Sequence, residues 1–184
     1  IFFPVVSPDG RRVFFKLARG SGGDDFRTAA ASVREGKFVY DIASGRPIRF
    51  FPRWGHPSWH PDSLRILEKG NILIDIFTGR ERGLAPIPTD HPSFAPDGTL
   101  FVSDGKAADH AATGNLVVSV GSAFTEAQAR VDTFRGTAGA RSWRRSHPHP
   151  AFSADGRRIY YNVNEGEWTE LRVAEVSPAG DGGC

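Results

Sequence analysis

His91-Pro92-Ser93-Phe94-Ala95-Pro96-Asp97-Gly98 is one of four versions of the same phrase in this chain. The other three are Val5-Val6-Ser7-Pro8-Asp9-Gly10, His56-Pro57-Ser58-Trp59-His60-Pro61-Asp62-Ser63 and His147-Pro148-His149-Pro150-Ala151-Phe152-Ser153-Ala154-Asp155-Gly156. In each version a short apolar stretch leads into Pro-Asp-Gly or a close variant. Pro and Asp favour a tight turn, and Gly tolerates a positive φ. Alternating apolar residues follow each turn, so every version predicts two strands joined by a tight turn.

The turn aspartates Asp9, Asp62, Asp97 and Asp155 lie 53, 35 and 58 residues apart. Propeller blades run roughly 40–50 residues, with insertions in loops. Third strands are expected at 37–41, 71–75, 115–118 and 170–174, and fourth strands at 47–50 and 129–132. A short helix is expected at 28–34, and the two longest loops, 20–35 and 106–115, are expected to help build a binding site. The sequence therefore predicts an all-β fold, a β-propeller of about four blades.

As a single domain, the chain is expected to divide into blades at roughly 1–47, 48–88, 89–135 and 143–177, with a flexible tail at 178–184. Four blades are fewer than most propellers have. The chain also contains no methionine and begins at Ile1, inside an apolar run. We therefore expect it to be a piece of a longer protein.

The composition, 39% hydrophobic and 24% charged residues among 184, is that of a soluble globular protein. No apolar run reaches the roughly 18–20 residues of a membrane span. The net charge is +2 and the basic residues are scattered, which argues against nucleic acid as a partner. Cys184 is the single cysteine, so no internal disulfide is possible.

Histidines stand at the start of three of the expected innermost strands, at His56, His91 and His147. They should therefore converge at one mouth of the central channel. His149 follows His147 by two residues, and in an extended segment held by Pro148 and Pro150 both rings project to one side. Several imidazoles together suit a divalent transition metal.

A structural role is the alternative, because a histidine before a proline can cap a carbonyl group or fill space beside the next blade. His60 replaces a turn residue and is expected at the surface. Asp104-Gly105 is most simply a turn. Trp59 is expected to pack between blades.

These residues resemble those of the oligogalacturonate lyases, a family of seven-bladed propellers. The resemblance rests on four features: a histidine ahead of the Asp97-Gly98 turn, a strand ending in Asp104-Gly105, Ser142-Trp143, and then His147-Pro148-His149-Pro150. His56-Pro57-Ser58-Trp59 is a weaker match. At the level of repeats the resemblance covers nearly the whole chain, which would form about the C-terminal half of such an enzyme.

The resemblance implies that His91, His147 and His149 bind Mn²⁺ or another divalent metal, and that His56 is the general base. The family's fourth metal ligand is a glutamine, at a position occupied here by Arg144. Arg144 stays protonated and cannot be a ligand. Arg27 is the nearest candidate for the arginine that meets the substrate carboxylate, and Arg144 and Arg145 are candidates for binding the substrate. A cytoplasmic location is implied as well, with a periplasmic one left open.

The implied reaction is β-elimination on a short oligogalacturonide or a related uronide, in which a base removes the C5 proton beside the carboxylate. A metal and an arginine on that carboxylate stabilise the negative charge, and a neutral imidazole can take the proton. The other function considered is non-catalytic: a TolB-like propeller that binds a protein or a small ligand. A bound metal would distinguish the lyase from the binding propeller, because the binding propeller requires no metal.

Overall fold

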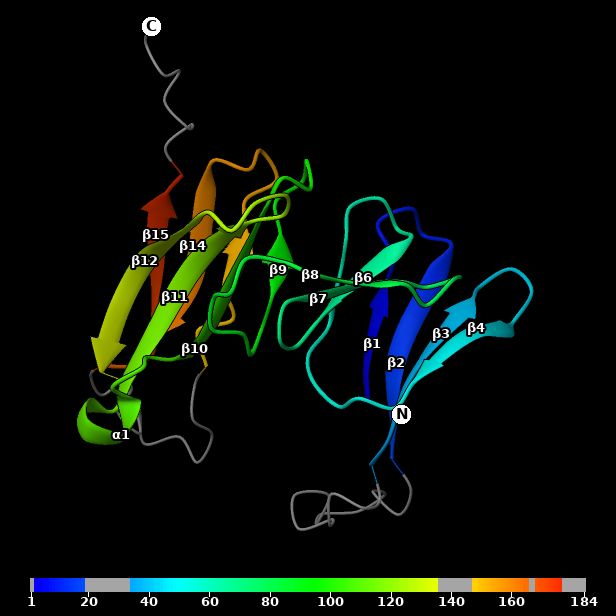
Figure 1. Ribbon diagram of the computed structural model, residues 1–184, viewed down its shortest axis with the longest axis horizontal. Helices are drawn as coiled ribbons and strands as arrows, with labels where there is room; N and C mark the ends of the chain where they lie inside the picture. The colour runs from blue at the N-terminus through cyan, green and yellow to red at the C-terminus, as the bar shows by residue number, and fades with distance from the viewer. Residues whose placement is uncertain (1, 19–33, 136–146, 166–167, 177–184) are drawn as a thin grey trace, which may run out of the picture.

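The computed structural model describes residues 2–18, 34–135, 147–165 and 168–176, and its strands form four antiparallel sheets (Figure 1). The first sheet contains β1 (Phe2–Val6), β2 (Arg12–Ala18), β3 (Arg34–Asp41) and β4 (Arg46–Phe51). The second contains β5 (Ser58–Trp59), β6 (Arg65–Glu68), β7 (Ile72–Asp75) and β8 (Glu81–Gly83). The third contains β9 (Ser93–Phe94), β10 (Leu100–Lys106), β11 (Asn115–Ser122) and β12 (Gln128–Arg135). The fourth contains β13 (Ala151–Phe152), β14 (Arg158–Val163) and β15 (Glu170–Glu175).

Within every sheet the strands follow one another in chain order, as in the blades of a propeller. The first strands of the second, third and fourth sheets lie side by side, because β9 contacts both β5 and β13. The predicted fold class, an all-β propeller arrangement of four blades, is therefore confirmed. No helix among the described residues is long and apolar enough to span a membrane.

The repeated turn phrase forms the same turn in each blade. The residue after the turn aspartate has a positive φ every time: 71° at Gly10, 72° at Gly98 and Gly156, and 62° at Ser63. In this left-handed region glycine has no Cβ to clash, which explains why three of the four residues are glycine.

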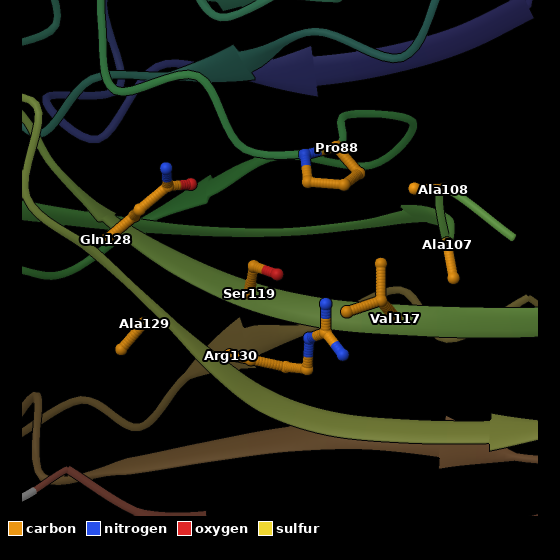
Figure 2. A pocket seen from close by; sticks show the side chains of 8 residues that line it. All are labelled: Pro88, Ala107, Ala108, Val117, Ser119, Gln128, Ala129 and Arg130. Carbon is orange, nitrogen blue, oxygen red and sulfur yellow. The ribbon is translucent and has the colours of Figure 1, made fainter.

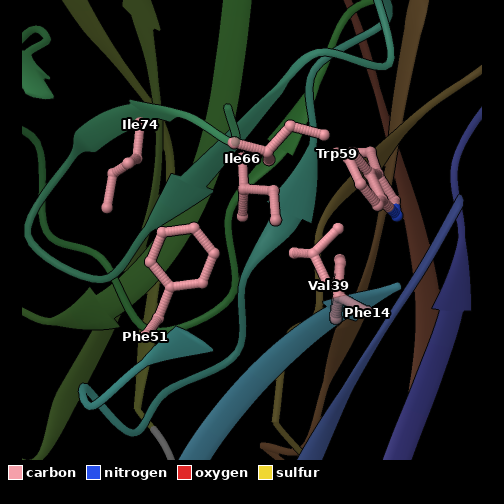
Figure 3. Packing of buried hydrophobic residues seen from close by; sticks show 7 residues of the cluster. Phe14, Val39, Phe51, Trp59, Ile66 and Ile74 are labelled. Carbon is pink, nitrogen blue, oxygen red and sulfur yellow. The ribbon is translucent and has the colours of Figure 1, made fainter. Parts of the chain in front are cut away.

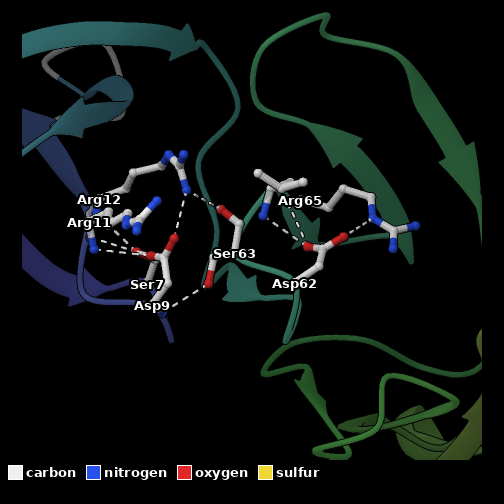
Figure 4. A network of polar contacts seen from close by, with 8 residues as sticks. Ser7, Asp9, Arg11, Arg12, Asp62, Ser63 and Arg65 are labelled. Carbon is white, nitrogen blue, oxygen red and sulfur yellow. Dashed lines mark hydrogen bonds and ion pairs between the residues drawn. The ribbon is translucent and has the colours of Figure 1, made fainter.

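Ser63, the exception, links the first two blades through its own polar atoms (Figure 4). Its hydroxyl accepts the backbone N–H of Asp9 at 3.0 Å, and its carbonyl accepts Nη1 of Arg12 at 3.2 Å. Arg12 also donates to the carboxylate of Asp9 at 3.0 Å. A side chain at this position therefore makes a contact between blades that glycine would lack.

Apolar side chains pack between neighbouring sheets. Figure 3 shows the cluster between the first two blades, which contains Phe14, Val39, Phe51, Trp59, Ile66, Ile74 and Ile76. As predicted, Trp59 packs between blades: its ring lies 5.5 Å from that of Phe14, and its Nε1 donates to the carbonyl of Val5 at 3.0 Å. Two further clusters join the second blade to the third and the third to the fourth. Each valine, leucine, isoleucine or phenylalanine in these clusters contributes about 1.5–3 kcal/mol when fully buried.

A buried ion pair also joins the first two blades. Lys37 of β3 donates to Glu68 of β6 at 2.6 Å, with side chains only 1% and 2% exposed. Burial lowers the pKa of Lys37 and raises that of Glu68, because the low-dielectric interior disfavours both charges. The other Glu68 oxygen, Oε1, has no hydrogen-bond partner among the described residues.

Two local predictions are wrong. Asp104-Gly105 lies inside β10 and is not a turn, because this strand continues to Lys106. His60 is buried rather than at the surface, since its ring packs edge-on against Phe94 of the next blade at 4.6 Å.

The predicted helix at 28–34 lies outside the described residues except for Arg34, which begins β3. The 106–115 loop contains α1 (His110–Thr113), which ends at Gly114 with a φ of 73°.

Candidate metal centre

Four aromatic rings gather where the innermost strands begin, and they occupy equivalent positions in the repeat. Counting back six residues from each turn aspartate reaches Phe3, His56, His91 and His149, each followed by proline. Their rings follow one another in blade order, with centroids 5.3 Å apart for Phe3 and His56, 4.6 Å for His56 and His91, and 3.8 Å for His91 and His149. The convergence expected from the sequence is therefore present.

Three histidines of this group can hold a metal ion. One donor nitrogen from each of His91, His147 and His149 lies within 4.8 Å of the others. His91 precedes β9, while His147 and His149 precede β13, so two neighbouring blades supply the donors. Neutral imidazoles bind divalent transition metals, and the residues present therefore fit such an ion.

Asp104 orients this cluster from inside β10. Its two carboxylate oxygens each lie 2.9 Å from Nδ1 of His91, and Oδ1 also accepts the His91 backbone N–H at 2.8 Å. The backbone N–H of His149 donates to Oδ2 at 3.3 Å. A carboxylate on Nδ1 keeps the proton there and leaves Nε2 of His91 available to a metal.

The segment around His149 is not extended, contrary to prediction. His149 has a φ of 44°, in the left-handed region, although the following Pro150 would ordinarily favour an extended conformation. Such a conformation costs on the order of 1–3 kcal/mol and persists only where its surroundings impose it. The hydrogen bond to Asp104 and the ring contact with His91 are two such constraints.

His56 lies beside the three candidate ligands in a half-buried position. Its pKa is lowered to about 4, chiefly by burial and then by the positive charge of Lys16 and by the other histidines. Burial and His91 likewise lower the pKa of His149 to about 4. Both rings are therefore neutral near pH 7, as a base or a metal ligand must be.

Lys16 occupies in the first blade the position that Asp104 occupies in the third, seven residues after the turn aspartate. It is buried in β2, and its ammonium lies over the rings of Phe3 at 4.7 Å and Trp54 at 5.4 Å. In the repeat, the His91–Asp104 pair is thus replaced in the first blade by a phenyl–ammonium pair.

A small cavity of about 110 Å³ opens among these rings. Its walls are Phe3, His56, His91 and His149, together with prolines 57, 92 and 150. A substrate group entering this cavity would meet His56 and two of the candidate ligands at once.

The predicted substrate-binding residues Arg27, Arg144 and Arg145 lie outside the described residues. Sequence reasoning missed the role of Asp104. Its position seven residues after the turn aspartate Asp97 could have indicated this role. Strands β9 and β10 pair Ser93 with Val102. Continuing this register by two residues along each strand places Asp104 opposite His91.

No protein-family model matches the sequence, and no curated protein matches it either. Among solved structures, TolB from Acinetobacter baumannii is similar, with a TM-score of 0.61 and 18% identity over 94% of this chain and 40% of TolB. An oligogalacturonate lyase in complex with manganese also has a TM-score of 0.61, with 16% identity over 96% of this chain and 65% of the lyase. An oligogalacturonate lyase from Vibrio parahaemolyticus has a TM-score of 0.54 and 14% identity, covering 96% of this chain and 66% of the lyase.

At these identities the similarity establishes the fold and no more. The chain spans between two fifths and two thirds of the length of these structures. It therefore has the propeller fold that TolB and the oligogalacturonate lyases share.

Proposed function

We propose that this chain belongs to an oligogalacturonate lyase-like enzyme that cleaves short oligogalacturonides or related uronides by β-elimination. One observation carries the proposal. His91, His147 and His149 present donor nitrogens within 4.8 Å of one another, and the ring of His56 stacks on that of His91 at 4.6 Å. A metal-ligand set with a neutral base beside it is what this reaction requires.

In the proposed site, His91, His147 and His149 hold a divalent metal such as Mn²⁺, and Asp104 keeps His91 in the orientation and tautomer that binding needs. When bound, the metal supplies a positive charge that stabilises the uronate carboxylate as negative charge develops.

His56 accepts the C5 proton of the uronide. The C4–C5 double bond forms as the C4–O bond breaks, and the departing sugar keeps that electron pair and takes up a proton. Phe3 stacks on the ring of His56 with centroids 5.3 Å apart and supplies an apolar surface beside the base. Arg27, Arg144 and Arg145 are proposed to face the substrate carboxylates.

Metal content and elimination, measured together, test the proposal. Purified protein is loaded with MnCl₂, dialysed, and analysed for manganese, and elimination is followed by the absorbance of the unsaturated uronide. We expect about one manganese per chain in the wild type and in His110→Ala, a matched control whose ring bonds the Asn115 carbonyl away from the site. The double variant His147→Ala/His149→Ala should lose both metal and activity, while His56→Ala should keep the metal and lose activity.

A TolB-like binding propeller is the second candidate, favoured by the equal TM-score of the Acinetobacter baumannii protein. It predicts a folded wild type without stoichiometric manganese. That result, or metal retained in the double variant, would refute the lyase proposal.

A further inference from the structure

A second and larger cavity is lined by the segment that joins β8 to β9, by the residues after β10, and by β11 and β12 (Figure 2). Its volume is about 320 Å³, at the small end of the roughly 300–1,000 Å³ range of ligand pockets. One wall is Pro88, from the segment joining β8 to β9. The floor is the face of β11 and β12 that Val117, Ser119 and Arg130 share.

A glycine in β10 determines how closely the Pro88 segment approaches the sheet beside this cavity. A Cβ at Gly105 would lie 2.8 Å from the Cβ of Pro88, so only glycine lets this segment rest directly on β10. Beyond that contact the apolar part of the lining is small, with Ala107, Ala108 and Ala129. Ala108, Gln128, Ala129 and Arg130 are exposed, so the cavity is open to solvent on their side.

The polar groups of the cavity come from paired positions on two strands. Ser119 lies opposite Arg130, and Gly121 opposite Gln128, so that the side chains of Ser119, Arg130 and Gln128 emerge on one face. A register shift between Val118 and Ser119 produces this alignment.

Among the residues that the structure describes, none bonds to the side chains of Ser119, Gln128 or Arg130, and Gln128 and Arg130 are exposed to solvent. Ser119 is only 6% exposed, lines the cavity, and its hydroxyl makes no hydrogen bond to any described residue. Arg130 forms no ion pair within the described part of the chain. The acid nearest to it along β12, Asp132, already binds Tyr161 at 2.8 Å and Arg172 at 3.3 Å. The cavity thus offers a cation and two uncharged polar groups.

We propose that this cavity binds a small hydroxylated carboxylate, a sugar acid of about one monosaccharide unit. The guanidinium of Arg130 would pair with the carboxylate, as arginine does in bidentate recognition. Gln128 and Ser119 would bond ring hydroxyls, while Val117 and the alanines meet the apolar C–H surface. This site does not depend on the proposed lyase activity, because none of its residues belongs to the histidine cluster.

Calorimetric titration with D-galacturonate tests the site. It is carried out on the wild type and on His147→Ala/His149→Ala, which removes the other candidate site. Within the double variant, three further substitutions are compared: Arg130→Gln removes the cation, Ala108→Phe fills the cavity from its exposed rim, and Arg135→Gln is a charge-matched control on the same strand outside the cavity. D-galactose and inorganic phosphate serve as comparison ligands.

We expect one saturable D-galacturonate site in the double variant, unchanged by Arg135→Gln and weakened about tenfold or more by Arg130→Gln and by Ala108→Phe. D-galactose should bind at least tenfold more weakly, since it lacks the carboxylate. Absence of binding would overturn the inference, as would binding that survives both cavity variants. Phosphate binding as tightly as D-galacturonate would also overturn it, because the site would then recognise any small anion.

Discussion

Asp104 holds His91 at two points, accepting its ring Nδ1 at 2.9 Å and its backbone N–H at 2.8 Å. The side chain of Asp104 is only 2% exposed. Bulk water therefore does not compete with His91 for these hydrogen bonds. The same carboxylate reaches the backbone of His149, so one buried group positions two of the three candidate ligands.

Asp104→Asn should therefore weaken metal binding without removing a ligand. The amide offers one acceptor oxygen in place of two and cannot stabilise the Nδ1–H tautomer electrostatically, so we expect manganese affinity to fall about 10–100-fold. Competition with a metal-binding dye measures this. Asp90→Asn is the control, because Asp90 is next to His91 in sequence but pairs with Lys69. Equal affinities for Asp104→Asn and the wild type would contradict a positioning role.

Removing one partner of the buried Lys37–Glu68 pair should destabilise the contact between the first two blades. Glu68→Gln leaves a buried ammonium without a counter-charge, which costs about 3–5 kcal/mol. The double variant Lys37→Met/Glu68→Leu should recover most of that loss, because apolar residues of similar volume need no desolvation of charge. Urea unfolding compares the three proteins, and a double variant no more stable than Glu68→Gln would count against this account.

Ser63 combines a left-handed backbone with a bond between blades, and two substitutions separate these effects. Ser63→Ala keeps the unfavourable φ and loses the bond to Asp9, so we expect a loss of about 1 kcal/mol. Ser63→Gly loses the same bond but relieves the backbone, and should be more stable than Ser63→Ala by about 1 kcal/mol. Thermal unfolding of both variants tests the order, and the reverse order would show that the backbone is not strained.

The lowered pKa values of the turn aspartates predict that the protein becomes less stable in acid. The pKa of Asp155 is lowered, first by the hydroxyl of Ser153 and then by the backbone N–H of Arg157. The unfolded chain therefore binds this proton at a higher pH, near the ordinary value of about 3.9. The stabilisation is present above that value and is lost as the pH falls below it.

Asp155→Asn should consequently lower the urea midpoint at pH 7 and reduce the further drop between pH 5 and pH 2. Glu126→Gln, which changes an exposed carboxylate between β11 and β12, is the matched control. An unchanged acid profile for Asp155→Asn would show that the turn bonds do not persist in solution.

Much of this architecture follows from short-range chemistry that a single sequence carries. Pro, Asp and Gly at the turns, with alternating apolar residues after them, indicated the strands of each blade and the propeller fold. The positive φ at Gly98 is favoured by the glycine itself within the Pro-Asp-Gly turn, and local patterns predict such features well.

The remaining features depend on register and on distant contacts. Asp104 faces His91 because of the register in which β9 pairs with β10. The dipeptide Asp104-Gly105 is typical of a turn, and the sequence alone does not indicate that it lies inside a buried strand. His149, and not His147, occupies the same position in the repeat as His91, because both lie six residues before the turn aspartate of their blade. The cavity beside Arg130 depends on the register shift between β11 and β12 and on the approach of Pro88, and neither leaves a local pattern.

The equivalence of Phe3, His56, His91 and His149 has a consequence for protein engineering. These positions are copies of one place in the repeat, six residues before each turn aspartate, so each could be varied without changing the turn residues of its blade. One substitution per blade at this position would therefore decide whether an apolar ring or an imidazole lines the cavity that these residues share.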